Sequence, residues 1–434
     1  MPPAAGGGAA GRASAPLGMN AQAILVCAFI ASVQMTWGVI VPALPLLVER
    51  FGIGVGSIGL LIAAFAIGRV LANVPAGLAL RRIPPRPFLQ VVSVLLVALT
   101  AVTGLLDSEP LLLGARLLAG VLGGAAVTIG FAVLVAGAPA DRRGRTMATA
   151  TVVQMSGSAV GALLGGVVVE GWGVTAAFAV AAVPLLLCLG VDLLRPARHY
   201  WGAFRRSPEV PVSATVLEPV PEPHGASTSP VAAESADPTG FERSSGRRLV
   251  VGLVVFSFAT FLARFAGEQG LIPVLAYGTG GLSPLGLGVA MAVGTVVSIA
   301  VLPGIGRLVD RGARLTVLVP AGVVGAAVLL AFPFLTWPLG FGAAIVLYYL
   351  ATSVAGVVPN VVTSERFAPA AAGAVVGLTR TAGDVGAAVG PLLVFALAAA
   401  SGDLAAVAVI AAVLLVALAV LAPSLRPGRR SVIG

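Results

Sequence analysis

The sequence has few residues of the kinds that build chemical sites or soluble surfaces. Only 10% of its 434 residues are charged, against about 25% in a typical soluble domain. Histidine occurs only at positions 199 and 224, in one polar segment, and cysteine only at positions 27 and 188, in apolar stretches. The cysteines lack metal-ligand spacing, and the apolar stretches contain no Ser, His and Asp set. We therefore expect no metal site, no cofactor and no enzyme active site.

Apolar residues fill most of what remains. They make up 58% of the chain, and the mean hydropathy is +1.04. A membrane-spanning helix needs about 20 consecutive apolar residues, and we predict an all-α integral membrane protein with twelve such helices. Their approximate ranges are 22–47, 55–79, 88–106, 111–136, 147–169, 173–193, 249–276, 284–305, 315–333, 339–361, 373–397 and 403–422. Pro42, Pro45 and Pro273 are expected to bend the first and seventh of them.

The chain repeats itself at an offset of 229 residues. The stretch GSAVGALL at 157–164 returns as GAAVGPLL at 386–393, with six of eight positions identical. The same offset superimposes further residues without a gap: Gly38 on Gly267, Gly59 on Gly288, Gly77 on Gly306, Arg82 on Arg311 and Gly144 on Gly373. A repeat of this length in an apolar chain indicates two copies of one membrane unit. We predict two pseudo-symmetric six-helix bundles, at 19–194 and 249–423.

Basic residues set the expected orientation and the remaining segments. All 26 are arginine. Those outside the predicted helices fall on one side, in the turns near 81–86, 142–145, 307–314 and 366, in the middle segment and at both chain ends, and only Arg50, beside Glu49, falls on the other side. The positive-inside rule then places both termini in the cytoplasm. Residues 1–18 are expected to be disordered, 195–248 a cytoplasmic linker and 424–434 a cytoplasmic tail. Because the arginines are scattered between apolar runs, the net charge of +9 does not indicate nucleic-acid binding.

The aromatic start of the linker at 200–201 either lies along the membrane surface or anchors the end of helix six; we favour the second.

Three motifs resemble those of the major facilitator superfamily. The turn GRLVDRGAR at 306–314 resembles its signature loop, where an Asp can cap a neighbouring helix. The run beginning at Leu112 resembles its helix-four motif, and the glycines from Gly157 onward resemble the helix-five motif of its 12-helix drug/proton antiporters. The sequence departs from the family pattern at Arg81, which replaces an Asp, at Ala162, which replaces a Pro, and at Ala119, the polar position of the helix-four motif.

The resemblance implies two bundles that rock about a central cavity, so that the cavity opens alternately to each side. The motif residues to which it assigns a conformational role are Gly77, Arg81, Arg82, Arg116, Gly120, Gly157, Gly161, Gly306, Asp310, Arg311, Arg314, Gly386, Gly390 and Pro391.

Charged side chains inside the predicted helices are the candidates for function, because each costs about 2.5–3.5 kcal/mol on insertion scales. Arg264 precedes Glu268 by four residues, and Arg380 precedes Asp384 by four, so each pair shares a helix face. Each pair is either a self-neutralising packing contact or a proton-coupling site in which Glu268 or Asp384 gains and loses a proton. Arg69 is either a packed residue or a partner of Asp384 across the two halves.

Cavity walls in this superfamily come largely from helices one, four, seven and ten. The candidate lining residues, besides the charged ones, are Gln34, Trp37, Thr128, Gln269, Tyr348, Tyr349 and Asn360. The aromatic ones could stack on a flat ligand or serve only packing. We predict a monomeric, proton-coupled secondary transporter of the cell membrane that exports a small organic compound by antiport. An uptake symporter for a sugar or organic acid is the alternative. The expected partners are the substrate, protons and the lipid bilayer.

Overall fold

The computed structural model describes residues 19–52, 54, 56–139, 143–206, 240–367 and 369–425, and these contain helices and no strand. The first half consists of α1 (Met19–Gly38), α2 (Ile40–Phe51), α3 (Gly56–Ala79), α4 (Pro85–Thr103), α5 (Glu109–Gly137), α6 (Arg143–Leu194) and α7 (Arg198–Arg206). The second half consists of α8 (Gly240–Leu262), η2 (Ala263–Leu271), α9 (Ile272–Gly278), α10 (Pro284–Asp310), α11 (Arg314–Ala331), η3 (Phe332–Phe334), α12 (Pro338–Arg366), α13 (Pro369–Ser401), α14 (Asp403–Leu421) and η4 (Ala422–Leu425).

Eleven helices in the described part of the chain are long and apolar enough to cross a membrane. One of them, α6, has 52 residues, which would extend about 78 Å as a straight helix, against a bilayer core of about 30 Å. Its backbone leaves the helical region at Gly173, where φ is +81°. The two parts, 143–172 and 174–194, therefore provide two crossings, as predicted. The all-α fold with twelve spanning segments is confirmed.

The bends predicted for the first and seventh crossings are present. The first is divided at Val39 into α1 and α2, and Pro42 and Pro45 lie within α2. In the seventh, the chain passes from α8 through the π-helix η2 into α9, whose first turn contains Pro273. Both interruptions leave short helical pieces on one side of the membrane.

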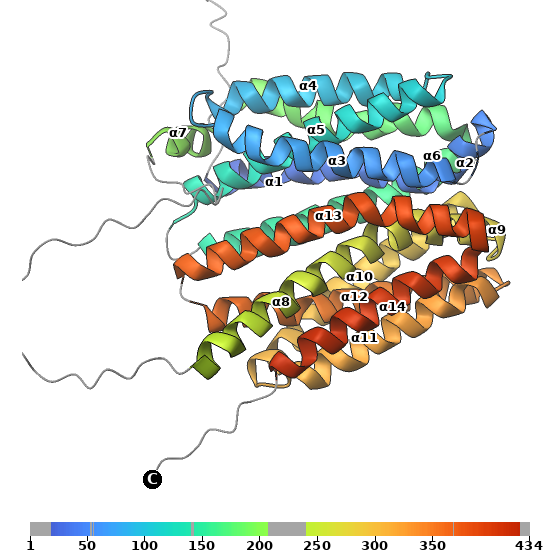
Figure 1. The fold of residues 1–434 in the computed structure, drawn as a ribbon. Coiled ribbons are helices and arrows are strands. Elements are labelled where there is room, and N and C mark those ends of the chain that lie inside the picture. The colour runs from blue at the N-terminus through green and yellow to red at the C-terminus, as the bar shows by residue number, and fades with distance from the viewer. Residues whose placement is uncertain are drawn as a thin grey trace, which may run out of the picture.

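The two halves lie against one another, with α13 along the boundary between them (Figure 1). The repeat offset holds closely: adding 229 to both bounds of α5 gives the bounds of α12. We call the end of the molecule where α8 begins and α14 ends the terminal end. The opposite end, with the turns at 104–108 and 279–283, is the far end.

Two equivalent seams join the halves at the far end. A Cβ atom built on Gly59 of α3 would lie 2.6 Å from the carbonyl oxygen of Pro391 in α13. A Cβ built on Gly288 of α10 would lie 2.5 Å from the carbonyl oxygen of Ala162 in α6. Because the offset relates Gly59 to Gly288 and Ala162 to Pro391, the seams are copies of one contact. Only glycine permits the backbones to approach so closely.

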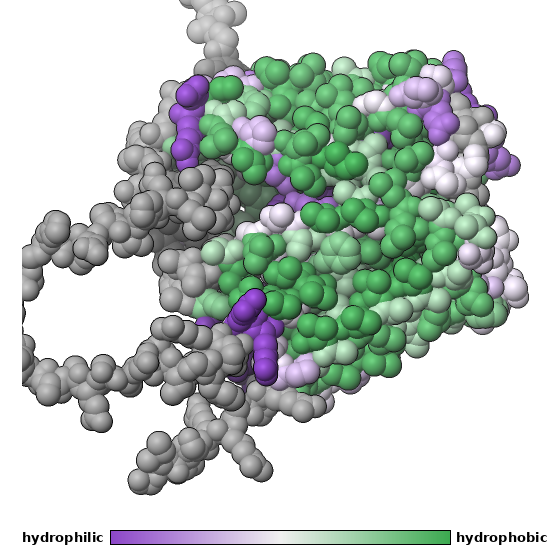
Figure 2. Space-filling view, in the orientation of Figure 1, coloured by the Kyte–Doolittle hydropathy of each residue, from purple (hydrophilic) through white to green (hydrophobic). Residues whose placement is uncertain are grey.

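On the face shown in Figure 2, apolar side chains cover most of each half between the two ends, with hydrophilic residues at the boundary between the halves. Exposed residues of this kind include Leu71, Val91, Leu187, Leu347 and Val416. A continuous apolar surface of this extent is expected for a protein whose solvent is lipid.

Both ends of the expected linker are helical. Residues 198–206 form α7, and 240–248 form the start of α8. The centre of the linker, the segment 1–18, Arg142 and the arginines after Leu425 lie outside the described residues.

Candidate functional site

The seventh crossing contains nine residues of π-helix, η2, where three of the candidate residues lie: Arg264, Glu268 and Gln269. π-Helical turns are rare, and they are frequent at functional sites. The π turns also change what the repeat-equivalent glycines contact. A Cβ on Gly38 would meet the carbonyl oxygen of Ser158 at 2.2 Å, whereas one on Gly267 would have only loose side-chain neighbours, the nearest at 3.5 Å. The second half has therefore lost a tight helix contact where it carries its charges.

Glu268 lies in an apolar setting with one weak ion pair. Its Oε1 is 3.9 Å from Nε of Arg264, and its side chain is 14% exposed, against 38% for Arg264. The hydroxyls of Tyr348 and Tyr349 lie close enough to interact electrostatically with the charge of Glu268. The Tyr349 hydroxyl interacts with the Glu268 carboxylate as a hydrogen-bond donor, and the Tyr348 hydroxyl has no hydrogen-bond partner among the described residues. The carboxylate is thus compensated by one long ion pair and one tyrosine hydroxyl, in a setting that is otherwise largely buried.

Asp384 connects the two halves. Its Oδ2 accepts a hydrogen bond from Nδ2 of Asn73 in α3, at 3.4 Å. Thr128 of α5 donates to Oδ1 of the same asparagine, also at 3.4 Å. The Arg69 guanidinium, one turn from Asn73, interacts electrostatically with Asp384, Arg380 and Arg264. The structure therefore brings the helix-seven and helix-eleven charges together with Arg69 at the boundary between the halves.

Sequence reasoning missed Asn73. The residue carries no charge and matches no motif, yet its amide joins Asp384 to Thr128. The available signal was its position four residues after Arg69 in an otherwise apolar helix, which places both side chains on one face. The repeat-equivalent residue is Leu302, so the polar group belongs to one half only.

The remaining cavity candidates differ in their surroundings. Trp37 is buried, and its ring stacks on Phe65 with centroids 4.2 Å apart. Gln269 is buried, and its Oε1 has no partner in the described part of the chain, while Gln34 is half-buried. Asn360 is exposed, and its amide donates to the carbonyl oxygen of Gly356 in its own helix. Because Tyr348, Tyr349 and Trp37 are all buried, none of these rings is open to a flat ligand in this conformation.

The motif glycines lie where helices touch backbone to backbone. A Cβ on Gly157 would lie 2.5 Å from the carbonyl oxygen of Ala31, and one on Gly161 3.0 Å from the Cα of Gly38, so α6 packs directly on α1. In the second half, Gly386 and Gly390 of α13 contact α8 in the same manner. Gly120 of α5 approaches the Phe65 carbonyl of α3.

The signature loops lie at the terminal end. Gly77 is buried in α3, and Arg81 and Arg82 are exposed in the turn after it. Asp310 and Arg311 are exposed, Gly306 is half-buried, and Arg314 forms an ion pair with Glu365 of α12. Asp310 does not cap α11: it lies in the last turn of α10, while the N-cap of α11 is Ala313, which makes no side-chain cap bond.

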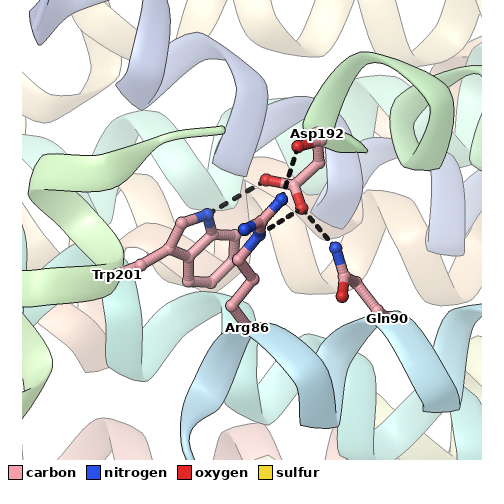
Figure 3. A network of polar contacts seen from close by, with 4 residues as sticks. All are labelled: Arg86, Gln90, Asp192 and Trp201. Atoms are coloured by element: carbon pink, nitrogen blue, oxygen red, sulfur yellow. Dashed lines mark hydrogen bonds and ion pairs between the residues drawn. The ribbon is translucent and has the colours of Figure 1, made fainter. Parts of the chain in front are cut away.

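A buried carboxylate that the sequence did not reveal fixes α7 to the first half (Figure 3). The side chain of Asp192, at the end of α6, is fully buried. It accepts hydrogen bonds from Nε of Arg86 at 2.9 Å, Nε2 of Gln90 at 2.7 Å and Nε1 of Trp201 at 3.0 Å. Tyr200 is also buried, against Gly137. The aromatic residues of α7 are therefore packed inside the first half rather than spread on a membrane surface.

Asp192→Ala is expected to destabilise the protein by about 3–5 kcal/mol, because it leaves the Arg86 charge and two further donors without their acceptor. The melting temperature should fall by about 6 °C or more. Asp107→Ala is the matched control: Asp107 pairs with Arg50, but its side chain is 85% exposed, so its removal should cost less than about 1 kcal/mol. Equal melting temperatures for the two variants would refute the role given to Asp192.

Residues 24–391 match the family model described as Major Facilitator Superfamily.

The chain belongs to the major facilitator superfamily.

Relatives of this superfamily member agree with that assignment. A Schizosaccharomyces pombe protein named as an uncharacterized MFS-type transporter is 32% identical over 166 residues, which cover 36% of this chain and only 37% of that protein. A chloramphenicol resistance protein of Streptomyces lividans is 29% identical over 301 residues, 68% of this chain and 67% of that protein. The protein is thus a multi-pass membrane transporter of this superfamily.

Two solved structures share its fold at low sequence identity. One is a bacterial homologue of the human lysosomal transporter Spinster, in an inward-facing and unoccupied conformation, with a TM-score of 0.67 and 14% identity over 94% of this chain and 97% of that one. The other is the human organic anion transporter MFSD10, with a TM-score of 0.57 and 18% identity over 93% of this chain and all of that one. At these identities the likeness concerns the fold.

Proposed function

We propose that this superfamily member exports a small organic compound in exchange for protons, by alternating access, as a monomer in the cell membrane with both termini in the cytoplasm. The observation that carries the proposal is the polar contact between the halves, Asn73 with Asp384, beside the Glu268–Arg264 pair. The name of the Streptomyces lividans relative, a chloramphenicol resistance protein, supports export. The arginine distribution supports the orientation.

In this proposal Glu268 takes up the proton. Its ion pair with Arg264 is long and its side chain is largely buried, so the ionised form is stabilised only by that pair and the Tyr349 hydroxyl. Protonation removes its attraction to Arg264, which changes the field at Arg69 and Asp384. The Asp384–Asn73 bond then weakens, and α3 and α13 can move apart. Because the seams close the far end, we infer that this conformation opens toward the terminal end, which the proposed orientation makes cytoplasmic.

Proton coupling is tested in proteoliposomes with an imposed pH gradient and chloramphenicol as the first probe. The drug should move opposite to the protons. Glu268→Gln and Asp384→Asn should each abolish accumulation against a gradient, while gradient-free exchange survives. Asp403→Asn is the control, since that acid is exposed at the start of α14. If both Glu268→Gln and Asp384→Asn still accumulate the drug, the proton role is wrong.

The same experiment separates export from uptake. A symporter for a sugar or organic acid would move its substrate in the direction of the protons. Reversing the pH gradient therefore gives opposite signs for the two mechanisms, whatever the rate.

A further inference from the structure

A permanent charge lies buried in the first half, away from the charges at the boundary. Arg116 of α5 is 2% exposed. Its guanidinium carbon lies 4.7 Å from the ring centre of Trp37 and 5.0 Å from that of Phe65. The two aromatic faces attract the cation, but they accept none of its directional N–H bonds.

Three donors around this charge lack a partner. Nε and Nη2 of Arg116 and Nε1 of Trp37 are buried without a hydrogen-bond acceptor among the described residues. Arginine and tryptophan side chains can only donate. None of the ion pairs in the described part of the chain includes Arg116. The site therefore has an excess of donors and of positive charge, and no described residue accepts a hydrogen bond from these three donors.

A small cavity lies beside these donors. It has room for about one water-sized species (≈ 10 Å³), and it is lined by Arg116, Trp37, Ala119, three threonines and four apolar residues, Ile40, Phe65, Leu96 and Phe178. The hydroxyls of Thr36 and Thr103 already donate to the backbone carbonyls of Val33 and Leu99. Ala119 stands at the position of the helix-four motif where the family has a polar residue. Its methyl group does not fill the cavity, and it cannot accept a hydrogen bond from the guanidinium.

The second half has no charge at the equivalent place. The repeat offset relates Arg116 to Ile345 and Trp37 to Ala266, both buried apolar residues. The second half packs its copy of the same helix, α12, with no cation there. Retaining an arginine in the first half is therefore costly unless a ligand compensates for it.

We propose that this cavity binds one monovalent inorganic anion of the chloride class, held by Arg116 and the Trp37 indole. An anion supplies the missing acceptor and cancels the buried charge, which a neutral water would not do. The site lies inside the first half and is separate from the charged residues proposed for transport. Its occupancy should make the stability of the protein depend on the anion rather than on ionic strength.

The experiment measures the melting temperature of the purified full-length protein in sodium chloride, bromide and gluconate at constant ionic strength. For saturating chloride, the temperature should rise by roughly 2 °C for each tenfold increase in concentration. Bromide should substitute for chloride, and gluconate should not. Crystals grown in bromide should show an anomalous scattering peak beside Arg116.

Ala119→Gln is the decisive variant, because its amide fills the cavity and its oxygen can accept from the guanidinium three residues earlier. The variant should lose the halide response while staying folded without halide. Thr295→Val, in the second half, removes a buried hydroxyl that donates to the Met291 carbonyl and should keep the response. An unchanged response in Ala119→Gln, no response in the wild type, or ordered water without an anomalous peak would each overturn the proposal.

Discussion

Gly288→Leu is expected to stop transport almost completely while leaving the protein folded. A Cβ at this position would lie 2.5 Å from the Ala162 carbonyl oxygen and 3.2 Å from the Cα of Leu163. Both neighbours are backbone atoms, which cannot rotate away as a flexible side chain could. The halves would have to separate at the far end, so the state described here would lose its packing. A penalty of about 3 kcal/mol lowers its population more than a hundredfold.

Two measurements check this result. Transport in proteoliposomes, with chloramphenicol as the probe of the proposed function, should fall to background. Spin labels at Leu105→Cys and Leu339→Cys, exposed at the far end of each half, should report a longer distance than in the parent protein with its two native cysteines replaced. Gly304→Leu is the matched control on the same helix, since a Cβ there meets nothing within 4 Å. Normal transport with an unchanged label distance in Gly288→Leu would refute the seam.

Gly120→Leu is expected to prevent folding altogether. The contact between α3 and α5 is reciprocal: a Cβ on Gly120 would lie 2.1 Å from the Phe65 carbonyl oxygen, and one on Gly68 2.1 Å from the Leu117 carbonyl oxygen. A leucine would force apart two helices in the interior of one half and would also displace Phe65 from Trp37. We expect a loss above about 4 kcal/mol, the range of severe core disruption.

The yield of monodisperse protein and its melting temperature measure this effect. Gly114→Leu, in the same helix, is the control, because Gly114 is exposed and a Cβ there meets nothing within 4 Å. That variant should fold as well as the wild type, or slightly better, since leucine favours helix over glycine by up to about 1 kcal/mol. If Gly120→Leu purifies with a wild-type melting temperature, the helix contact is wrongly described.

The fold was largely predictable, because hydropathy and the repeat act over long stretches. Twelve apolar runs determined the crossings, since a bilayer core leaves little choice of length. The offset of 229 residues relates Gly59 to Gly288 from the sequence alone, without knowledge of which residues either glycine contacts. What it could not supply was the partner of each glycine, which depends on how the two halves are rotated against one another.

The charged residues of the candidate site were the easiest part of it to predict. Arg264, Glu268, Arg380 and Asp384 attract notice because charge is rare in membrane helices. The π-helix that contains Glu268 forms when backbone hydrogen bonds span five residues instead of four. The amino-acid composition of the segment does not show which of these two patterns it adopts.

Contacts between distant parts of the chain were equally hidden from the sequence. Asp192 binds Arg86 from 106 positions away, and Asn73 binds Asp384 from 311 positions away. Such pairs depend on how the helices pack against one another. A single sequence does not show this packing directly.

The two seams have a consequence for leakage. They are related by the internal repeat, with α3 and α13 forming one and α6 and α10 the other. When one half rotates as a rigid body, the helices of both seams are displaced at the same time. Neither seam is therefore expected to open alone. The far end then behaves as one barrier with two positions, open or shut. Half-open states, through which protons or small solutes could leak without coupled transport, would be sparsely populated.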